Sequence, residues 1–376
     1  MATLCQQYAR LQRGYVTPGE RLACKGRIEV RATRKRSNSR LQRLTPAGKL
    51  LEMIAMRHVP QALHVVAVLG VADLLGDGPK NADELAQATG SHGRTLYRVL
   101  RTLVAAGVFA EDKAGHFRLT ELGQPLRSDV ADSVRAASVF LSGESELEGR
   151  LIDCVRSGKT AIELASGTTD WIEYYRQPTR AAVFNAAMTA LSNAHYAGVA
   201  DAYDFRSIRK LVDVGGGHGR LISMILTTYP KMRGVLFDLP HALEGGQRMI
   251  AEAGLSNRCE VVSGDFFRSV PRGGDAYILS RVIHDWTDEK AVAILKVVRG
   301  VLPANGRLLL FETMIGASNR LSYPLLSDLN MVIRTGGCER SEAEYRALYK
   351  AAGLKLTRAI KTPSPTGMTI IEGKPA

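Results

Sequence analysis

Three side chains suited to hydrogen bonding or proton transfer follow three successive apolar runs in the second half of the chain: Asp238, Asp265 and His284. If the runs are parallel strands, their carboxyl ends meet at one edge of a sheet and the side chains converge there. Asp238 is suited to accept from ribose hydroxyls, and Asp265 from an adenine amino group while Phe266 packs on the ring. A histidine at the same edge can take up a proton near neutral pH. We therefore expect a site for an adenosine-containing ligand with an acid–base group beside it.

A glycine-rich turn is predicted to hold that ligand. The run 211–214 is typical of a buried strand, and Gly215, Gly217 and Gly219 follow it at alternate positions before an apolar helical run. Glycine accepts positive φ and lets a ligand approach the backbone without meeting a Cβ atom. The dinucleotide fingerprint needs a third small residue where this chain has Arg220. The spacing instead resembles that of proteins that bind S-adenosylmethionine (SAM), which carries no phosphate.

Strand-like and helical runs alternate from residue 211 onward, which predicts a parallel sheet with helices on both faces. The end of the chain differs, because two strand-like runs flank the turn 362–367 and form a hairpin that introduces one antiparallel strand. We expect an α/β domain at 206–376 with seven strands, near 211–214, 234–237, 260–262, 276–279, 307–311, 354–360 and 368–372.

The first half of the chain has a mainly helical pattern. Apolar positions recur at helical spacing over 50–75, and two shorter helices are predicted at 82–90 and 94–106, the second capped by Ser91. Two short β-runs then flank a turn at 113–115. Helix, turn, helix and β-wing together predict a winged helix.

A winged helix is either a DNA reader or a platform for dimerisation. Three arginines lie on its second helix, but acidic Glu111 and Asp112 stand at the wing beside them, so nucleic-acid binding is the less favoured reading. We expect a homodimer formed through this domain. The predicted divisions are a winged-helix dimerisation domain at 46–140 and a helical linker with substrate-pocket helices at 141–205.

The basic charge of the chain is concentrated at its start. The formal net charge is +13, of which +9 lies in residues 1–45 and only +4 in the rest. We interpret residues 1–45 as a disordered basic tail, with a targeting peptide or residues upstream of the true start as alternatives. The five cysteines form no CxxC pair, which argues against a zinc site or disulfide framework and fits a reducing cytoplasm. No apolar run reaches the roughly 18 residues that a membrane helix needs.

Four motifs occur in a specific order: Val212-Asp-Val-Gly-Gly-Gly217, Phe237-Asp-Leu-Pro240, Gly264-Asp-Phe266 with His284-Asp-Trp286, and Gly336-Gly-Cys-Glu-Arg340. Through them, residues 46–376 resemble the SAM-dependent O-methyltransferases of the plant caffeate and bacterial polyketide or phenazine type. The resemblance implies a Rossmann-like class I methyltransferase domain behind a winged-helix dimerisation domain. It also implies SAM as methyl donor, S-adenosylhomocysteine as product, and no metal.

The resemblance implies a set of cofactor contacts along the glycine turn and the strand ends. The chain has Ser280 where the plant enzymes have a lysine facing the cofactor, so it sides there with the bacterial branch. The implied contacts are Asp213, Gly215 and Gly217 at the methionine end of SAM, Asp238 at the ribose, and Asp265 with Phe266 at the adenine.

The resemblance also implies that His284 is a general base oriented by Glu312 and Glu339. A phenol has a pKa of roughly 10 and an imidazole of roughly 6.5, so the histidine is basic enough only if the imidazolium is stabilised. A carboxylate on the other ring nitrogen stabilises it and fixes the tautomer.

Structural interpretations of the same residues remain open. His284 could cap the next helix, Glu339 could pair with Arg340 or Arg334, and Asp285 could be a helix N-terminal acid rather than an active-site contact. Candidate substrate contacts, equally explicable as core or helix-face residues, are Met188, Asp285, Asn330 and Met331.

We expect a cytoplasmic homodimeric O-methyltransferase that acts on a hydroxyl of an aromatic or polycyclic secondary metabolite. One alternative keeps the fold and methylates carbon or nitrogen, or uses SAM without methyl transfer. Another is a winged-helix regulator that senses SAM.

Overall fold

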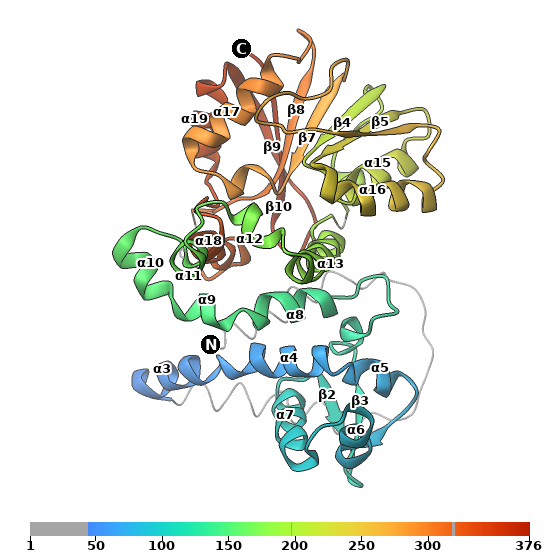
Figure 1. The fold of residues 1–376 in the computed structure, drawn as a ribbon, viewed down its shortest axis with the longest axis vertical. Helices are drawn as coiled ribbons and strands as arrows, with labels where there is room; N and C mark the ends of the chain where they lie inside the picture. The colour runs from blue at the N-terminus through green and yellow to red at the C-terminus, as the bar shows by residue number, and fades with distance from the viewer. Residues whose placement is uncertain (1–43, 197, 318–319) are drawn as a thin grey trace. The chain divides into compact units, whose positions relative to one another are not determined.

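The computed structural model describes residues 44–196, 198–317 and 320–376. The chain divides into two compact units, Met1–Gly143 and Glu144–Ala376 (Figure 1). The basic tail predicted at 1–45 therefore lies, except for its last two residues, outside the described residues. Within the described ranges, none of the helices combines the length and apolarity needed to span a bilayer.

The first unit is mainly helical and carries a small antiparallel sheet. The strands have the order β1-β3-β2, and β3 pairs with both neighbours. The elements are α3 Pro46–Ala55, α4 His58–Val68, α5 Val71–Gly76, β1 Lys80–Asn81, α6 Ala82–Thr89, α7 Gly93–Ala105, β2 Phe109–Glu111, β3 His116–Leu119, the short helix η2 Gln124–Leu126 and α8 Arg135–Gly143.

Helix α7 shows why this unit folds as predicted. Leu96, Leu100 and Leu103 recur at helical spacing and are buried in the core of the unit. The arginines predicted on this helix lie on its exposed face. The Ser91 cap is wrong, because α7 begins at Gly93 behind His92, and the Ser91 hydroxyl instead accepts from Thr89 at 2.9 Å.

The second unit contains a seven-stranded sheet of order β6-β5-β4-β7-β8-β10-β9. Strand β10 is antiparallel to both β8 and β9, and β4, β5, β6, β7 and β8 pair in parallel. The seven strands and the single antiparallel strand confirm the prediction. The strands are β4 Lys210–Val214, β5 Arg233–Asp238, β6 Cys259–Ser263, β7 Ala276–Ser280, β8 Arg307–Thr313, β9 Leu354–Lys361 and β10 Met368–Pro375.

Helices cover both faces of this sheet (Figure 1). Val212 and Val214 of β4 pack in the cluster that includes α17 (Asp288–Arg299) and α19 (Glu342–Ala351). Leu211, one residue out of phase, packs instead with α15 (Arg220–Thr228) and α16 (Pro240–Glu252). Alternate side chains of a strand thus belong to two cores, and a strand apolar on both faces is the signature of a sheet buried between helix layers.

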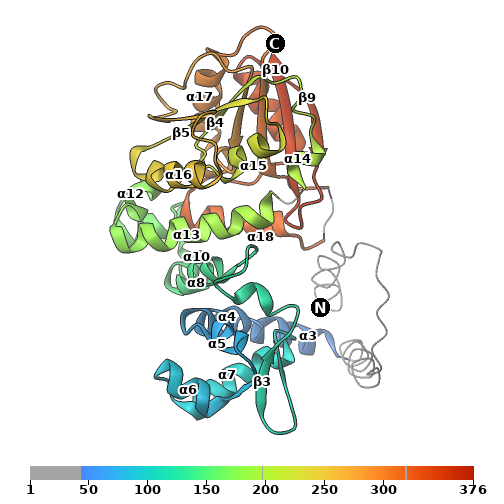
Figure 2. The same ribbon diagram turned by 90° about the vertical axis from the view of Figure 1, so that its right-hand side faces the viewer.

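Further helices lie at the end of the sheet where β7 finishes. Figures 1 and 2 both place α13 and α18 at that end. The Tyr196 hydroxyl, just after α13, lies 2.8 Å from Ser280 Oγ at the end of β7. Helices therefore cover the carboxyl edge of the sheet. The helices of this region are α9 Ser145–Gly149, α10 Leu151–Ser157, α11 Ala161–Ser166, α12 Trp171–Tyr175, α13 Pro178–His195 and α18 Tyr323–Arg334. Helix α14 (Val199–Ala202) follows α13 and packs beside α15 instead.

Candidate active site

The glycine turn between β4 and α15 has the backbone that its sequence predicts. Gly215 and Gly217 have φ of 70° and 54°, values that residues with a Cβ atom rarely adopt. At Gly216 a Cβ atom would lie 2.6 Å from the Asp213 carboxyl. The turn thus requires glycine at these three positions, and it folds over the buried carboxyl group of Asp213.

Asp213 is 1% exposed, and neither of its carboxylate oxygens has a hydrogen-bond partner within the described residues. Burial, and then the negative charge of Asp238, raise the pKa of Asp213 to about 8. An unpartnered buried carboxylate is costly unless a cation or donor reaches it. The two carboxyl oxygens of Asp213 therefore fit a ligand with a positive charge, and SAM carries both an ammonium and a sulfonium.

Asp238 links the end of β5 to the glycine turn. Its Oδ2 accepts from the Gly217 amide at 2.7 Å and its Oδ1 from the Leu239 amide at 2.6 Å. Burial raises the pKa of Asp238 although these two amides act in the opposite direction. Each carboxylate oxygen retains a lone pair, so the fixed carboxylate can still accept from two hydroxyls.

The next strand end brings Asp265 and Phe266 to the same turn. A Cβ atom at Gly215 would lie 3.5 Å from the Phe266 ring. Asp265 Oδ1 accepts from the Phe267 amide at 2.8 Å, and its side chain is 40% exposed. The structure thus brings the predicted adenine contacts beside the predicted methionine contact, and their role with SAM stays a prediction.

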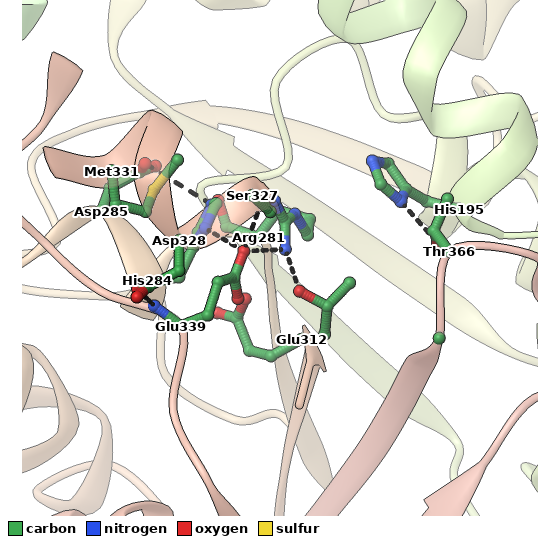
Figure 3. A network of polar contacts seen from close by, with 12 residues as sticks. His195, Arg281, His284, Asp285, Glu312, Ser327, Asp328, Met331, Glu339 and Thr366 are labelled. Atoms are coloured by element: carbon green, nitrogen blue, oxygen red, sulfur yellow. Dashed lines mark hydrogen bonds and ion pairs between the residues drawn. The ribbon is translucent and has the colours of Figure 1, made fainter. Parts of the chain in front are cut away.

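His284 lies in the short helix η3 (Ile283–Asp285) after β7 and is 4% exposed. Its Nδ1 faces Glu339 Oε1 at 3.2 Å, and its Nε2 faces the Arg281 carbonyl oxygen at 3.1 Å and Asp285 Oδ1 at 3.5 Å (Figure 3). Burial and Arg281 lower its pKa, but Asp285, Glu339 and Glu312 outweigh them and raise it. With acceptors at both ring nitrogens, this geometry suits the imidazolium. His284 does not cap α17, whose N-cap is Thr287.

Glu339 is the buried centre of the cluster in Figure 3. Its Oε1 accepts from Arg281 Nη1 at 2.8 Å and from Ser327 Oγ at 2.7 Å in addition to facing His284. Burial opposes its ionisation, but Arg281 and His284 hold the pKa of Glu339 well below its usual range. Its ion pairs are therefore with His284 and Arg281, and the alternative pairing with Arg340 or Arg334 is not formed between these described side chains.

Glu312, at the end of β8, binds the backbone of the short helix η3 that carries His284. Its Oε1 accepts from the Ile283 amide at 2.9 Å, and its Oε2 has no hydrogen-bond partner among the described residues. Burial raises the pKa of Glu312 to about 7. One ligand atom from each of His284, Glu312 and Glu339 lies within 4.8 Å of the others, as in a metal site, but the Arg281 guanidinium already brings a positive charge to this group.

Arg281 was not predicted as a site residue. It has φ of 56°, and its guanidinium donates to Thr313 and Ser327 besides Glu339. Such a backbone conformation in a non-glycine residue is strained and is often found at functional sites. The available signal was its place directly after the strand-ending Ser280, but its ion-pair partner Glu339 is 58 residues away.

Two other motif residues hold the histidine turn in place. Arg340 is 1% exposed and donates to the carbonyl oxygens of Ile283 and Trp286, at 3.1 and 2.8 Å. A Cβ atom at Gly337 would lie 2.0 Å from the His284 carbonyl oxygen. The glycine in this loop is thus required for the close approach that brings Glu339 to His284.

The candidate substrate contacts have local partners. Asn330 Oδ1 accepts from Arg334 at 2.8 Å, Met331 is buried beside Thr335, and the Met188 carbonyl oxygen accepts from Ser192. The side chain of Asp285 is 17% exposed and lies 3.5 Å from His284 Nε2, before α17 begins, which brings it into the cluster. Substrate contact by these four residues stays a prediction.

Two protein-family profiles match this chain. A family profile described as an O-methyltransferase domain matches residues 149–355, and one described as an O-methyltransferase dimerisation domain matches residues 51–129. The phenazine O-methyltransferase PhzM of Lysobacter antibioticus is 38% identical over 340 residues, which cover 90% of this chain and 99% of that protein.

Solved structures of similar proteins have the same fold. The structure of LaPhzM is 38% identical in sequence, the match covers 89% of this chain and all of that chain, and the TM-score is 0.84. That of NcsB1, from neocarzinostatin biosynthesis, is 35% identical, covers 84% of this chain and 96% of its own, and has a TM-score of 0.72. NcsB1 was solved in complex with SAM and 2-hydroxy-5-methyl naphthoic acid. The chain therefore belongs to the O-methyltransferase family of enzymes that carry an N-terminal dimerisation domain.

Proposed function

We propose that this protein transfers the methyl group of SAM to a hydroxyl of an aromatic or polycyclic secondary metabolite, with His284 as general base. The observation that carries the proposal is the contact of His284 Nδ1 with the ionised Glu339, which leaves Nε2 as the nitrogen that takes the proton. The acceptor class is supported by the relatives, which are named for phenazine and naphthoate substrates.

The residues that would hold SAM are those of the glycine turn and the strand ends. Asp213 would face its cationic methionine end, Asp238 its ribose, and Asp265 with Phe266 its adenine. SAM supplies a methyl group on a positively charged sulfur, which is already electrophilic. The protein therefore has to align the acceptor oxygen and remove its proton.

His284 would remove that proton at Nε2. The ring can accept it only in the neutral form, in which Nδ1–H donates to Glu339 and Nε2 turns from the Arg281 carbonyl toward the acceptor hydroxyl. After transfer, the imidazolium is stabilised by Glu339 on one side and Asp285 on the other. Arg281 acts indirectly, because it keeps Glu339 ionised and in place.

We infer further that the protein is a cytoplasmic homodimer. Helix α3 has no buried residue, and its apolar Leu50, Leu51, Met53 and Ile54 are exposed, a pattern typical of a surface that a partner covers. The described cysteines Cys154, Cys259 and Cys338 are free thiols, as expected in a reducing compartment.

The test is methyl transfer from isotope-labelled SAM to a panel of hydroxylated phenazines and naphthoates. Mass spectrometry and NMR of the product identify the methylated atom. An O-methyl product supports the proposal, and an exclusive C- or N-methyl product contradicts it. SAM binding without turnover, together with salt-dependent affinity for DNA, would favour a regulator.

A further inference from the structure

A second buried histidine, His195, lies at the C-terminal end of α13 and is 5% exposed. The next residue, Tyr196, contacts Ser280 at the end of β7. The His195 ring itself meets the Tyr323 ring of α18 edge-on, with 5.8 Å between the ring centroids. Figure 3 shows His195 across from the Arg281 and Glu339 cluster. His195 therefore belongs to the wall of the same site, although the sequence did not mark it.

A chain of hydroxyls determines which ring nitrogen of His195 carries the proton. Ser364 Oγ lies 3.0 Å from the Ala194 carbonyl oxygen, which can only accept, so Ser364 donates there. Ser364 Oγ must then accept from the Thr366 hydroxyl at 2.9 Å. Thr366 Oγ1 is left to accept from His195 Nδ1 at 2.9 Å. His195 is therefore the Nδ1–H tautomer, with its lone pair on Nε2.

Nothing in the described part of the chain donates a hydrogen bond to that Nε2 lone pair. In Figure 3 the edge of the ring that carries it is turned away from Thr366. Burial, followed by the positive charges of Arg281 and His284, holds the pKa of His195 well below its ordinary value, with Glu339 acting weakly in the opposite direction. The ring is thus neutral and largely buried, and its Nε2 can accept a hydrogen bond for which the described residues supply no donor.

We propose that His195 is a specificity-determining residue whose Nε2 accepts a hydrogen bond from a second donor group, a hydroxyl or an amino N–H, on the methyl acceptor. The inference rests on the proposed function and narrows its substrate class to aromatic compounds with at least two donor groups. An acceptor that lacks the second donor leaves Nε2 unpaired in a buried site, and such sites reject their analogues strongly.

The test compares two substitutions at His195 on two methyl-acceptor substrates. His195→Phe keeps an aromatic ring but has no atom that accepts a hydrogen bond, and His195→Gln places an amide oxygen near the position of Nε2. The probes are the dihydroxynaphthalene isomer that the wild type methylates fastest and the naphthol that keeps only the methylated hydroxyl. We expect the wild type to prefer the diol by at least 10-fold in kcat/KM. His195→Phe should lose that preference, mainly through a raised KM for the diol, and His195→Gln should retain most of it.

Three results would overturn the inference: a wild type without preference, a His195→Phe variant with unchanged preference, or an equal loss on both probes, which indicates a structural role. His116→Phe, at a partly exposed histidine of the wing, is the control. If the wild type methylates neither probe nor any phenol of the wider panel, the proposed function fails with it. If the wild type is active but His195→Phe leaves the preference for the diol unchanged, this inference alone fails.

A second measurement needs no acceptor. In protein labelled with ¹⁵N-histidine, the His195 resonances should report Nδ1–H and an unprotonated Nε2 at neutral pH. Thr366→Val, which removes the acceptor of Nδ1–H, should introduce the Nε2–H tautomer, and Thr366→Ser should not. An imidazolium or an Nε2–H ring in the wild type contradicts the proposal.

Discussion

Arg281 Nη1 lies 2.8 Å from Glu339 Oε1, the same oxygen that faces the His284 ring. One oxygen of Glu339 thus contacts both a permanent cation, Arg281, and a titratable group, His284. The permanent cation holds the pKa of Glu339 well below its usual range, while its own charge lowers the pKa of His284. The balance between these two effects sets how basic the histidine is.

Glu339→Gln should therefore change the pH profile as well as the rate. The Glu339 carboxylate helps to raise the pKa of His284, so the limb of kcat/KM that ascends with pH should lie above pH ~6.5 in the wild type and move to lower pH in the variant. The maximal rate should fall by roughly 10- to 100-fold, since general-base assistance is worth about 10²–10⁴-fold in all. An ascending limb that stays in place would show that Glu339 does not act on the base.

Gly337→Ala should lower kcat with little effect on SAM affinity. A Cβ atom there would lie 2.0 Å from the His284 carbonyl oxygen, so the loop carrying Glu339 has to move away from the histidine. Rate assays and calorimetric titration with SAM measure the two effects. Gly149→Ala, where a Cβ atom meets nothing within 4 Å, is the control. An unchanged kcat in Gly337→Ala would contradict the positioning role of this loop.

Asp213→Asn should stabilise the ligand-free protein and weaken SAM binding. A carboxyl whose pKa rises to about 8 on folding is protonated in the folded state and ionised in the unfolded state between pH ~4 and ~8, so stability falls as pH rises through that window. The variant removes this loss. Its advantage in melting temperature should grow by roughly 5 °C between pH 6 and pH 8, while SAM raises its melting temperature less than it raises that of the wild type. A pH-independent difference, or SAM stabilisation equal to that of the wild type, contradicts the role of this acid.

Replacing apolar residues of α3 should dissociate the dimer. Leu51 and Ile54 are 66% and 58% exposed, and α3 buries no side chain in its own unit. Light scattering should give twice the chain mass for the wild type and a larger monomer fraction for Leu51→Ser with Ile54→Ser. Val183→Ser, an exposed apolar position of the second unit, is the control. A wild type that is already monomeric would contradict the homodimer.

The strands and the reversed direction of the last one were accessible from the sequence because they depend on local patterns. Runs that are apolar on both faces predict strands between helix layers, and the turn 362–367 predicts the antiparallel β10. The three strand ends with Asp238, Asp265 and His284 were accessible for the same reason, since parallel strands bring their ends to one edge.

The contacts that hold His284 in place could not be predicted in the same way. Arg281 pairs with the distant Glu339, and Gly337 is required by a carbonyl 53 residues earlier in the chain, so neither requirement has a local signal. His195 is fixed by a hydroxyl chain that begins 169 residues later. Even the local Ser91 cap was wrong, because His92 takes the N-cap position of α7.

The most direct measurement is the single-turnover rate of methyl transfer for the wild type and His284→Ala, with SAM binding followed in parallel. We expect a loss of about 10²–10⁴-fold in the rate, no ascending pH limb from an imidazole in the variant, and unchanged SAM affinity. His116→Ala should behave as the wild type. A His284→Ala enzyme that transfers the methyl group at the wild-type rate would contradict the assignment of His284 as the base.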